Sequence, residues 1–418
     1  MEGRCGKLDG ISAQRRKTQG NLPIRPFKMV KPFQIARIPF LTFGPGSRKK
    51  VVSLTGRFGK NVLLVTGSAS LRRSGFLDEM ETALTKEGFH LAHYSVKGEP
   101  SPSLIDQIVH DNIPFRPEVV VAIGGGSVLD TGKAISAMLP IGETVMHYLE
   151  GVGTKQHPGT KIPFIAMPTT AGTGSEATKN AVLSEVGEKG FKKSLRHDNF
   201  VPDAALLDPE LTYDCPPEIT AASGMDCLTQ LIESYVSLAA NPFTDALALP
   251  AIRDVFHYLP EVYRQPRSEE GRSAMLYAAY ISGITLANAG LGTVHGIASA
   301  LGGLALIPHG ILCGTIMAEA NRITISKLLE NAPESIAMKK YIQLAELISG
   351  EQNISPRRCA EILPEFLDNL TSSLQLPRLS ALGITKEILV SSAKSTENKN
   401  NPVPLSENEI SELLLKRF

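Results

Sequence analysis

Residues with the chemistry of metal ligands lie in the second half of the 418-residue chain. Asp226 and Gln230 are four residues apart, so on a helix both side chains project from one face. On one unbroken helix His295 and His309 would be about 21 Å apart, but Gly302, Gly303 and Pro308 allow the chain to turn back. One carboxylate and two imidazoles suit Fe(II), Zn(II) or a similar divalent ion, with the Gln230 amide oxygen as a weak fourth ligand. The alternative for each histidine alone is a hydrogen-bonded core residue.

A glycine-rich loop in the first half has the features of a phosphate-binding turn. The apolar run Glu118–Ile123 leads into Gly124-Gly125-Gly126-Ser127, and a helical pattern follows through Met138. Glycine lets the backbone approach an anion, and a helix start supplies free N–H groups and a positive dipole. Ser127 and Asp130 are spaced as an N-cap residue and its partner. These features, in a loop that is neither GxGxxG nor GK[ST], predict nucleotide binding, and a well-capped turn is the alternative.

A second loop, rich in hydroxyl groups, follows the apolar run Ile162–Met167. It reads Pro168-Thr169-Thr170-Ala171-Gly172-Thr173-Gly174-Ser175-Glu176. Its glycines and hydroxyls suit the other side of a bound dinucleotide. The candidate cofactor contacts in this loop are Thr169, Thr170, Thr173 and Ser175.

Alternating strands and helices must position these two loops. Besides the two apolar runs already named, strand-like segments occur at Asn61–Thr66 and His90–Ser95, and Phe76–Glu87 has helical spacing. This βαβα order predicts a parallel sheet with helices on both faces. We expect an α/β dinucleotide-binding domain over residues 29–209. The basic segment 1–28 has no apolar core of a secretory signal, and we expect a disordered or start-site extension there.

The chain changes character after Asp208-Pro209. No strand pattern follows, so we expect an all-helical metal- and substrate-binding domain over residues 210–418. Helical patterns occur at Glu218–Leu238, Thr244–Tyr258, Ser273–Ala289, Thr293–Ala305, Met338–Ser349 and Pro364–Leu374.

Composition narrows the class of partner. Lys and Arg number 43 against 42 Asp and Glu, and this net charge of +1 gives no electrostatic basis for binding nucleic acid or an anionic membrane. Five cysteines without a CxxC pattern favour reduced thiols and a cytoplasmic location. The segment Ala274–Ala318 lacks charged residues, but its many Gly, Pro and His residues favour packed helices over a membrane span.

Together these segments resemble the iron-containing (group III) alcohol dehydrogenase family. The resemblance runs in order from about Phe40 to Asn321. It implies a dehydroquinate synthase-like architecture, with a catalytic metal between an α/β domain and a helical one. It also implies NAD(P)-dependent oxidation of alcohols or reduction of aldehydes, by hydride transfer with the metal polarising the substrate oxygen. The matching pieces are Gly124–Asp130 with Lys133, Pro168–Glu176, Asp208-Pro209, Ser223–Asp226, Gly292–Gly296 and Pro308–Gly310.

The resemblance assigns roles and also exposes two departures. The family's metal aspartate falls on Asp226 and two of its metal histidines on His295 and His309, which makes these histidines catalytic. Where the family has a further ligand histidine, this chain has Gln230. Where a histidine commonly lies near the nicotinamide, the chain has Ser299, whose hydroxyl could pass a proton through water.

The cofactor type depends on the end of the first strand. Many NAD-preferring members have an acidic residue there, whereas this chain has Gly67-Ser68. Without that carboxylate a 2′-phosphate is permitted, and Arg72 and Arg73 could bind it, so NADPH is favoured. The full cofactor set then comprises Gly67, Gly124, Gly125, Gly126, Ser127, Asp130, Thr169, Thr170, Thr173, Ser175, Asn180 and Lys193.

Some assignments keep an alternative. Asn180 could be a turn amide and Lys193 a surface lysine. A metal-independent NAD(P)H reductase and a non-catalytic nucleotide-binding relative are the alternatives to metal-dependent alcohol oxidation. A small alcohol or aldehyde is the expected substrate, and the family implies a homodimer or higher homo-oligomer.

Overall fold

The computed structural model describes residues 32–67, 70–187, 190–305 and 307–418. The extension expected over residues 1–28 lies outside the described residues, and so does Ser68. Residues Phe33–Phe418 form one compact unit, in which an α/β part is followed by a helical part. The predicted fold class is therefore confirmed.

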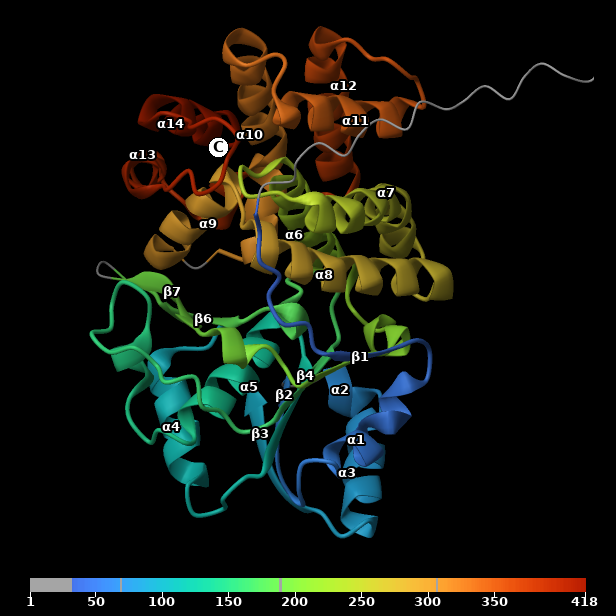
Figure 1. Cartoon of the computed structure of the whole chain (residues 1–418), viewed down its shortest axis with the longest axis vertical. Helices are drawn as coiled ribbons and strands as arrows, with labels where there is room; N and C mark the ends of the chain where they lie inside the picture. Colours follow the sequence, from blue (N-terminus) through green and yellow to red (C-terminus); the bar gives the residue numbers. More distant parts are fainter. Residues whose placement is uncertain (1–31, 68–69, 188–189, 306) are drawn as a thin grey trace, which may run out of the picture. The chain divides into compact units, whose positions relative to one another are not determined.

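A six-stranded parallel sheet forms the centre of the α/β part (Figure 1). Its strand order is β1-β8-β5-β4-β2-β3. The register sets Gly124 of β4 beside Pro168 of β5, so the two predicted loops leave the sheet side by side. The strands are β1 (Phe40–Phe43), β2 (Asn61–Gly67), β3 (His90–Val96), β4 (Val119–Gly124), β5 (Phe164–Pro168) and β8 (Ala204–Leu207).

Helices cover both faces of this sheet because its central strands are apolar on both sides. Along β2, Leu63 and Val65 point into one buried cluster, while Val62 and Leu64 point into another. The first cluster includes residues of α4 and α5, and the second includes residues of α1 and α3. The helices are α1 (Val51–Thr55), α2 (Ser70–Arg73), α3 (Phe76–Lys86), α4 (Pro102–Asn112) and α5 (Gly126–Met138).

The sequence pattern does not predict the antiparallel hairpin of β6 (Asn180–Glu185) and β7 (Phe191–Arg196). In β7 only Leu195 is buried, so the strand lacks the apolar alternation that would have revealed it. The hairpin packs against both α5 and α9, and it thereby joins the glycine-rich loop to the helical part (Figure 1).

The described residues beyond Pro217 form helices and no strand, as predicted. Three of these helices, α10, α13 and α14, have no counterpart in the predicted pattern. The buried face of α10 is nearly continuous along its first half, so it shows little amphipathic periodicity. The helices are α6 (Pro217–Val236), α7 (Pro242–Arg264), α8 (Glu269–Ala289), α9 (Thr293–Leu304), α10 (His309–Asn331), α11 (Ile336–Ser349), α12 (Pro356–Ser373), α13 (Lys386–Ser395) and α14 (Glu407–Lys416).

The start of α12 differs from its predicted position. The pattern places it at Pro364, but the helix begins at Pro356, and the Ser355 side chain caps it by accepting from the backbone N–H of Arg358. Ser355 before Pro356 is a favoured N-cap residue, whereas Leu363 before Pro364 is not, so the sequence does contain the signal for the earlier start. Pro364 instead lies inside the helix.

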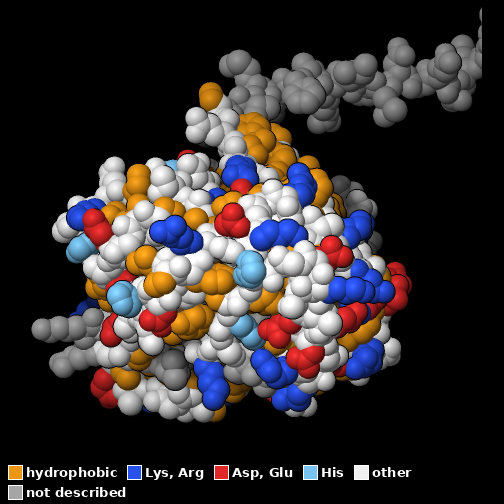
Figure 2. All heavy atoms as spheres, turned by 90° about the horizontal axis from the view of Figure 1, so that it is seen from below, with side chains coloured by type: hydrophobic (Ala, Val, Ile, Leu, Met, Phe, Trp, Pro, Cys, Tyr) orange, Lys and Arg blue, Asp and Glu red, His pale blue; other side chains and the backbone are white. Residues whose placement is uncertain are grey.

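Two surface properties bear on possible partners. Among the described helices, none alone is long and apolar enough to cross a membrane, although the pair α8 and α9, bent by 96°, passes that test together. On the face drawn in Figure 2, basic and acidic side chains are interspersed.

Candidate active site

The glycine-rich loop joins β4 to α5 and differs in one detail from its prediction. The N-cap of α5 is Gly125, in an extended conformation, and no side chain in the described residues caps this helix start. Ser127 is therefore inside the helix, and the predicted Ser127–Asp130 capping pair is wrong. Asp130 instead accepts hydrogen bonds from the Ser175 hydroxyl and from the backbone N–H of Val182. It ties the first loop to the second loop and to the hairpin.

Close packing explains two of the three consecutive glycines. A Cβ at Gly126 would lie 2.6 Å from Cγ2 of Thr173, and one at Gly124 would lie 2.6 Å from side-chain atoms of Val128. At Gly125 the nearest atom would be Oγ1 of Thr170 at 3.4 Å, a distance close to ordinary contact. The two loops thus pack directly on each other, and Gly125 and Gly126 at the start of α5 also line cavities.

A cavity of about 290 Å³ lies where the loops face the helical part. It brings together most of the predicted site residues from both parts of the chain. From the α/β part it is lined by Gly126, Ser127, Asp130, Thr173, Ser175 and Asn180, and from the helical part by Asp226, Gln230, His295, Ser299 and His309.

The remaining cofactor candidates lie around other cavities. Gly125, Thr169 and Thr170 line a cavity of about 420 Å³ together with Arg73. Lys193 is exposed on β7 and lines a cavity of about 690 Å³, which Asn180 and Ser299 also border. Gly124 lies at the end of β4, and Gly67 at the end of β2 on the same sheet.

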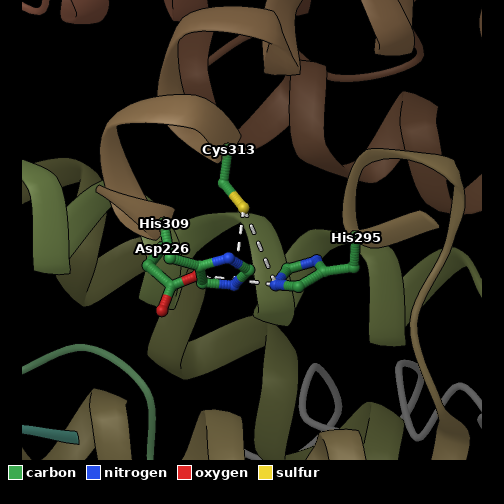
Figure 3. Close-up of side chains that lie close together, drawn as sticks. All are labelled: Asp226, His295, His309 and Cys313. Atoms are coloured by element: carbon green, nitrogen blue, oxygen red, sulfur yellow. Dashed lines mark hydrogen bonds and ion pairs between the residues drawn. The ribbon is translucent and has the colours of Figure 1, made fainter. Parts of the chain in front are cut away.

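The metal-ligand candidates meet in one buried cluster (Figure 3). The chain breaks between α9 and α10, so the rings of His295 and His309 lie 5.4 Å apart, centroid to centroid. Oδ1 of Asp226 is 3.4 Å from Nε2 of His295 and 3.5 Å from Nε2 of His309. This oxygen is buried and has no hydrogen-bond partner among the described residues. A buried, unpartnered carboxylate oxygen that faces two imidazole nitrogens fits a cation-binding site.

Two further residues of this site escaped sequence reasoning. Cys313, one turn after His309 on α10, contributes a fourth possible ligand atom, and the four atoms lie within 4.8 Å of one another. Glu233 on α6 accepts from Nδ1 of His295 at 2.6 Å and from the backbone N–H of Val294 at 2.7 Å. Its spacing of seven residues from Asp226 puts both on one helix face, which is a signal that could have found it.

The side chain of Gln230 contacts the cluster through hydrogen bonds, so its amide oxygen is not free to bind a metal. Its Oε1 accepts from the Ser282 hydroxyl at 2.8 Å, and its Nε2 lies 3.5 Å from Oδ2 of Asp226. In this arrangement the carboxamide holds the second oxygen of the Asp226 carboxylate. The first oxygen then faces the two histidines.

Mutual electrostatics favour the ionised forms of the cluster. Burial raises the pKa of Asp226, but the charges of His309 and His295 outweigh burial and hold that pKa below its usual value. Burial also opposes ionisation of Cys313, and the same two histidines overcome it and lower the pKa of the thiol. The pKa of His295 is raised well above 6.5, because the neighbouring Cys313 and Asp226 outweigh the effect of burial. The Asp226 carboxylate and the Cys313 thiolate thus supply the anionic groups that a divalent cation requires, and the histidines would bind it as neutral imidazoles.

Comparison with known proteins identifies the family. The description "Iron-containing alcohol dehydrogenase" matches residues 39–209, and "Fe-containing alcohol dehydrogenase family, C-terminal" matches residues 220–418. The chain therefore belongs to the iron-containing alcohol dehydrogenase family. It is an NAD(P)-dependent oxidoreductase that acts on CH–OH groups.

Individual relatives agree with this assignment. The chain is 36% identical over 282 residues to the NAD-dependent methanol dehydrogenase of Bacillus methanolicus, covering 66% of this chain and 72% of the relative. It is 32% identical over 390 residues to alcohol dehydrogenase 4 of Saccharomyces cerevisiae (strain YJM789), covering 91% of this chain and 97% of the relative. A crystal structure of 1,3-propanediol oxidoreductase matches with a TM-score of 0.82 and 28% identity, over 94% of this chain and all of that one.

Proposed function

We propose that this alcohol dehydrogenase holds a divalent metal at Asp226, His295 and His309, with Gln230 beside it. The observation that carries the proposal is the buried Oδ1 of Asp226, which faces two imidazole nitrogens and has no hydrogen-bond partner in the described part of the chain. When bound, the metal supplies Lewis-acid polarisation of the substrate oxygen. His295 and His309 would hold the ion through their Nε2 atoms, and Glu233 fixes the orientation of the His295 ring.

The cofactor side of the proposal rests on the two loops. The backbone around Gly124, Gly125 and Gly126 and the start of α5 would bind the pyrophosphate. The adenosine end would enter the 420 Å³ cavity bordered by Thr169 and Thr170. The nicotinamide would enter the 290 Å³ cavity, which is lined by Ser127, Asp130, Thr173, Ser175 and Asn180. Lys193, exposed at the rim, would meet the outer part of the bound ligands.

We further propose a preference for NADPH. Gly67 ends β2 without an acidic side chain that would repel a 2′-phosphate, and Arg73 lines the adenosine-side cavity. An Arg73→Ala variant should lose more kcat/KM with NADPH than with NADH. An equal loss with both cofactors would argue against this role.

Ser299 is proposed as a proton-transfer residue acting through water. Its hydroxyl donates to the carbonyl of His295 at 2.8 Å and lies 3.3 Å from the ammonium group of Lys399. Ser299 borders both the 290 Å³ and the 690 Å³ cavities, so it is a link between the reacting end and the outer vestibule. A Ser299→Ala variant should lower kcat and change its pH profile, whereas a purely structural serine would leave the profile unchanged.

The same proposal includes the organisation of the chain. We propose an α/β domain over residues 29–209, a helical domain over residues 210–418, and a homodimer or higher homo-oligomer. A cytoplasmic location suits the four cysteines of the described residues, Cys215, Cys227, Cys313 and Cys359, which are all free thiols.

The central test measures metal content and turnover together. Protein purified without chelator should carry about one equivalent of metal and interconvert alcohols and aldehydes with NAD(P). An Asp226→Ala variant should lose both the metal and the turnover while still binding NADPH. Turnover that survives complete removal of the metal would point to a metal-independent reductase instead.

A further inference from the structure

The thiol of Cys313 occupies a position that the proposed three-residue metal site leaves open. Its Sγ lies 3.8 Å from Nε2 of His309 and 4.0 Å from Nε2 of His295. In Figure 3 the Cys313 side chain lies above the rings of His295 and His309, and its sulfur is directed toward them. The side chain is fully buried. The thiol therefore lies among possible ligands and away from solvent.

Four distances within the cluster, two from oxygen to nitrogen and two from sulfur to nitrogen, are close to those of a tetrahedral site. With zinc–nitrogen and zinc–oxygen bonds of about 2.0–2.1 Å and a zinc–sulfur bond of about 2.3 Å, tetrahedral ligand atoms lie about 3.3–3.6 Å apart. The distances from Asp226 Oδ1 to the two imidazole nitrogens, 3.4 and 3.5 Å, are within this range. The two sulfur–nitrogen distances exceed it by only a few tenths of an ångström. A small inward movement of Cys313 would bring both sulfur–nitrogen distances into the same range.

The helix that contains Cys313 makes this position geometrically stable. His309 is the first residue of α10 and Cys313 is four residues later, so both side chains lie on one helix face. Two ligands from one helix turn, with one each from α6 and α9, enclose a central point from three directions. Gln230, by contrast, uses its amide oxygen for the hydroxyl of Ser282.

The other cysteines provide an internal comparison. Cys215, Cys227 and Cys359 are also buried and free, yet none of them belongs to the cluster of ligand groups found in the described residues. Each of these thiols has a raised pKa, because burial dominates its surroundings. Cys313 alone among these four lies beside two imidazoles and a carboxylate. Burial alone therefore does not explain why the Cys313 thiol lies beside these groups.

We propose that Cys313 is the fourth protein ligand of the metal, completing an Asp226–His295–His309–Cys313 site that prefers zinc to Fe(II). The inference rests on the proposed metal site and names the ligand that Gln230 does not provide. Thiolate is a soft ligand that favours zinc, whereas a neutral amide oxygen adds little affinity. The two anionic ligands also balance the charge of a divalent ion. Catalytic zinc sites can expand to five ligands, so the substrate oxygen retains access.

Cobalt(II) gives a direct readout of the proposed thiolate. The full-length protein, freed of metal and loaded with one equivalent of Co(II), should show a near-ultraviolet thiolate-to-cobalt charge-transfer band. A Cys313→Ser variant should lose this band and bind Zn(II) at least about 100-fold more weakly, a loss at the upper end of what removal of a supporting partner costs. A Cys359→Ala variant, which removes another buried thiol of the helical part, should keep both the band and the affinity.

A second set of measurements examines the bound metal directly. X-ray absorption at the zinc edge of the wild-type protein should show one sulfur at about 2.3 Å. In competition between Zn(II) and Fe(II) under anaerobic conditions, the wild type should select zinc more strongly than Cys313→Ser does. These readouts do not depend on enzymatic activity.

The outcomes separate this inference from the proposed function. A wild-type protein that binds stoichiometric metal and turns over alcohols, but has no sulfur around the metal, would overturn the role of Cys313 and leave the function intact. A sulfur-bound metal in a protein without turnover would support Cys313 and contradict the proposed function. Failure of the wild type to bind Co(II) or Zn(II) at all would overturn both.

Discussion

The two sides of the active site differ in the groups available for binding: backbone on the cofactor side and side chains on the metal side. On the cofactor side, the proposed binding element is the backbone near Gly124–Gly126, and two of these glycines are needed because side-chain atoms lie 2.6 Å from where a Cβ would be. On the metal side, the proposed ligands are side chains contributed by α6, α9 and α10. The cofactor side should therefore be sensitive to added atoms, and the metal side to altered functional groups.

Two buried carboxyl groups, one on each side of the site, also differ in their surroundings and in their pKa. In the described residues, Oδ1 of Asp226 and Oε1 of Glu176 are the buried side-chain atoms without a hydrogen-bond partner. Asp226 faces histidines and a thiol, and its pKa is lowered. Glu176 ends the second cofactor loop, and burial raises its pKa to about 7. The proposed cation would thus account for the Asp226 oxygen, whereas the raised pKa of Glu176 favours a neutral carboxyl group, which is less costly to bury.

The largest effect is expected from Asp226→Asn, which keeps the shape of the side chain and removes its charge. The metal loses its central anionic ligand, so kcat/KM for the alcohol should fall by more than the roughly 10- to 100-fold that loss of a supporting partner costs. NADPH affinity, measured by fluorescence titration, should stay within about twofold because the loops are untouched. A comparable loss of NADPH binding would break the division between the two sides.

Glu233→Gln should have the next largest effect. The Glu233 carboxylate accepts from Nδ1 of His295, and the amide that replaces it can present a donor to a donor. Metal affinity should fall about 10- to 100-fold, as measured by competition with a chromophoric chelator. Glu261→Gln, at a carboxylate that accepts from Ser268 elsewhere in the helical part, is the matched control. Equal losses in the two variants would show a general stability effect.

Gly126→Ala should raise the KM for NADPH about tenfold, equivalent to about 1.4 kcal/mol. Its Cβ would lie 2.6 Å from Cγ2 and 2.7 Å from Oγ1 of Thr173, so the two loops must separate. Thr173→Ala removes both atoms. The double variant should therefore lose less affinity than the sum of the two single variants, a coupling that a thermodynamic cycle measures. Additive losses would exclude this contact as the cause.

The smallest effect is expected from Glu176→Gln and concerns stability. Burial holds the pKa of Glu176 at about 7 in the folded chain, against an ordinary value of 4.5. The unfolded chain releases this proton at lower pH, so wild-type stability should fall as pH rises from about 4.5 to about 7. The charged groups around Glu176 are Lys133 and Asp130.

The variant cannot ionise at this position, so its Tm advantage over the wild type should grow across the same pH range. We expect a gain of about 2–4 °C at pH 7 relative to pH 5, by differential scanning calorimetry. A difference that is constant with pH would mean that Glu176 does not titrate in this window.

The contrast between the two sides also explains which features could be predicted from the sequence. The glycine-rich loop consists of consecutive residues, so its position at the end of β4 follows from the local pattern. Asp226, His295 and His309 could be named because their types and the break before α10 were visible. Cys313 and Glu233 share a helix face with His309 and Asp226, but many residues have such a spacing, so it is a weak signal. What distinguishes these two residues is their contact with the His295 ring on another helix, which a linear pattern does not contain.

Errors in the predicted elements have similar causes. Ser127 looks like an N-cap because a cap is expected at the first hydroxyl before a helix, yet the helix begins earlier, at Gly126. The hairpin β6–β7 is short and half exposed, and it has no clear apolar alternation. It is stabilised by tertiary contacts with α5 and α9, which a sequence pattern does not reveal. Asn180 and Lys193 lie on this hairpin, so their neighbours could not be predicted from the sequence pattern either.

The dual hydrogen bond of Glu233 has a consequence for how the metal is acquired. By accepting from both the His295 ring and the backbone N–H of Val294, this carboxylate secures the first turn of α9 before any ion arrives. A ring already held in place loses little rotamer freedom on coordination, so the entropic cost of loading is small. Amide hydrogens at the start of α9 should exchange slowly in the metal-free protein as well as in the loaded one. The metal site would then be a preorganised cradle, filled without local folding.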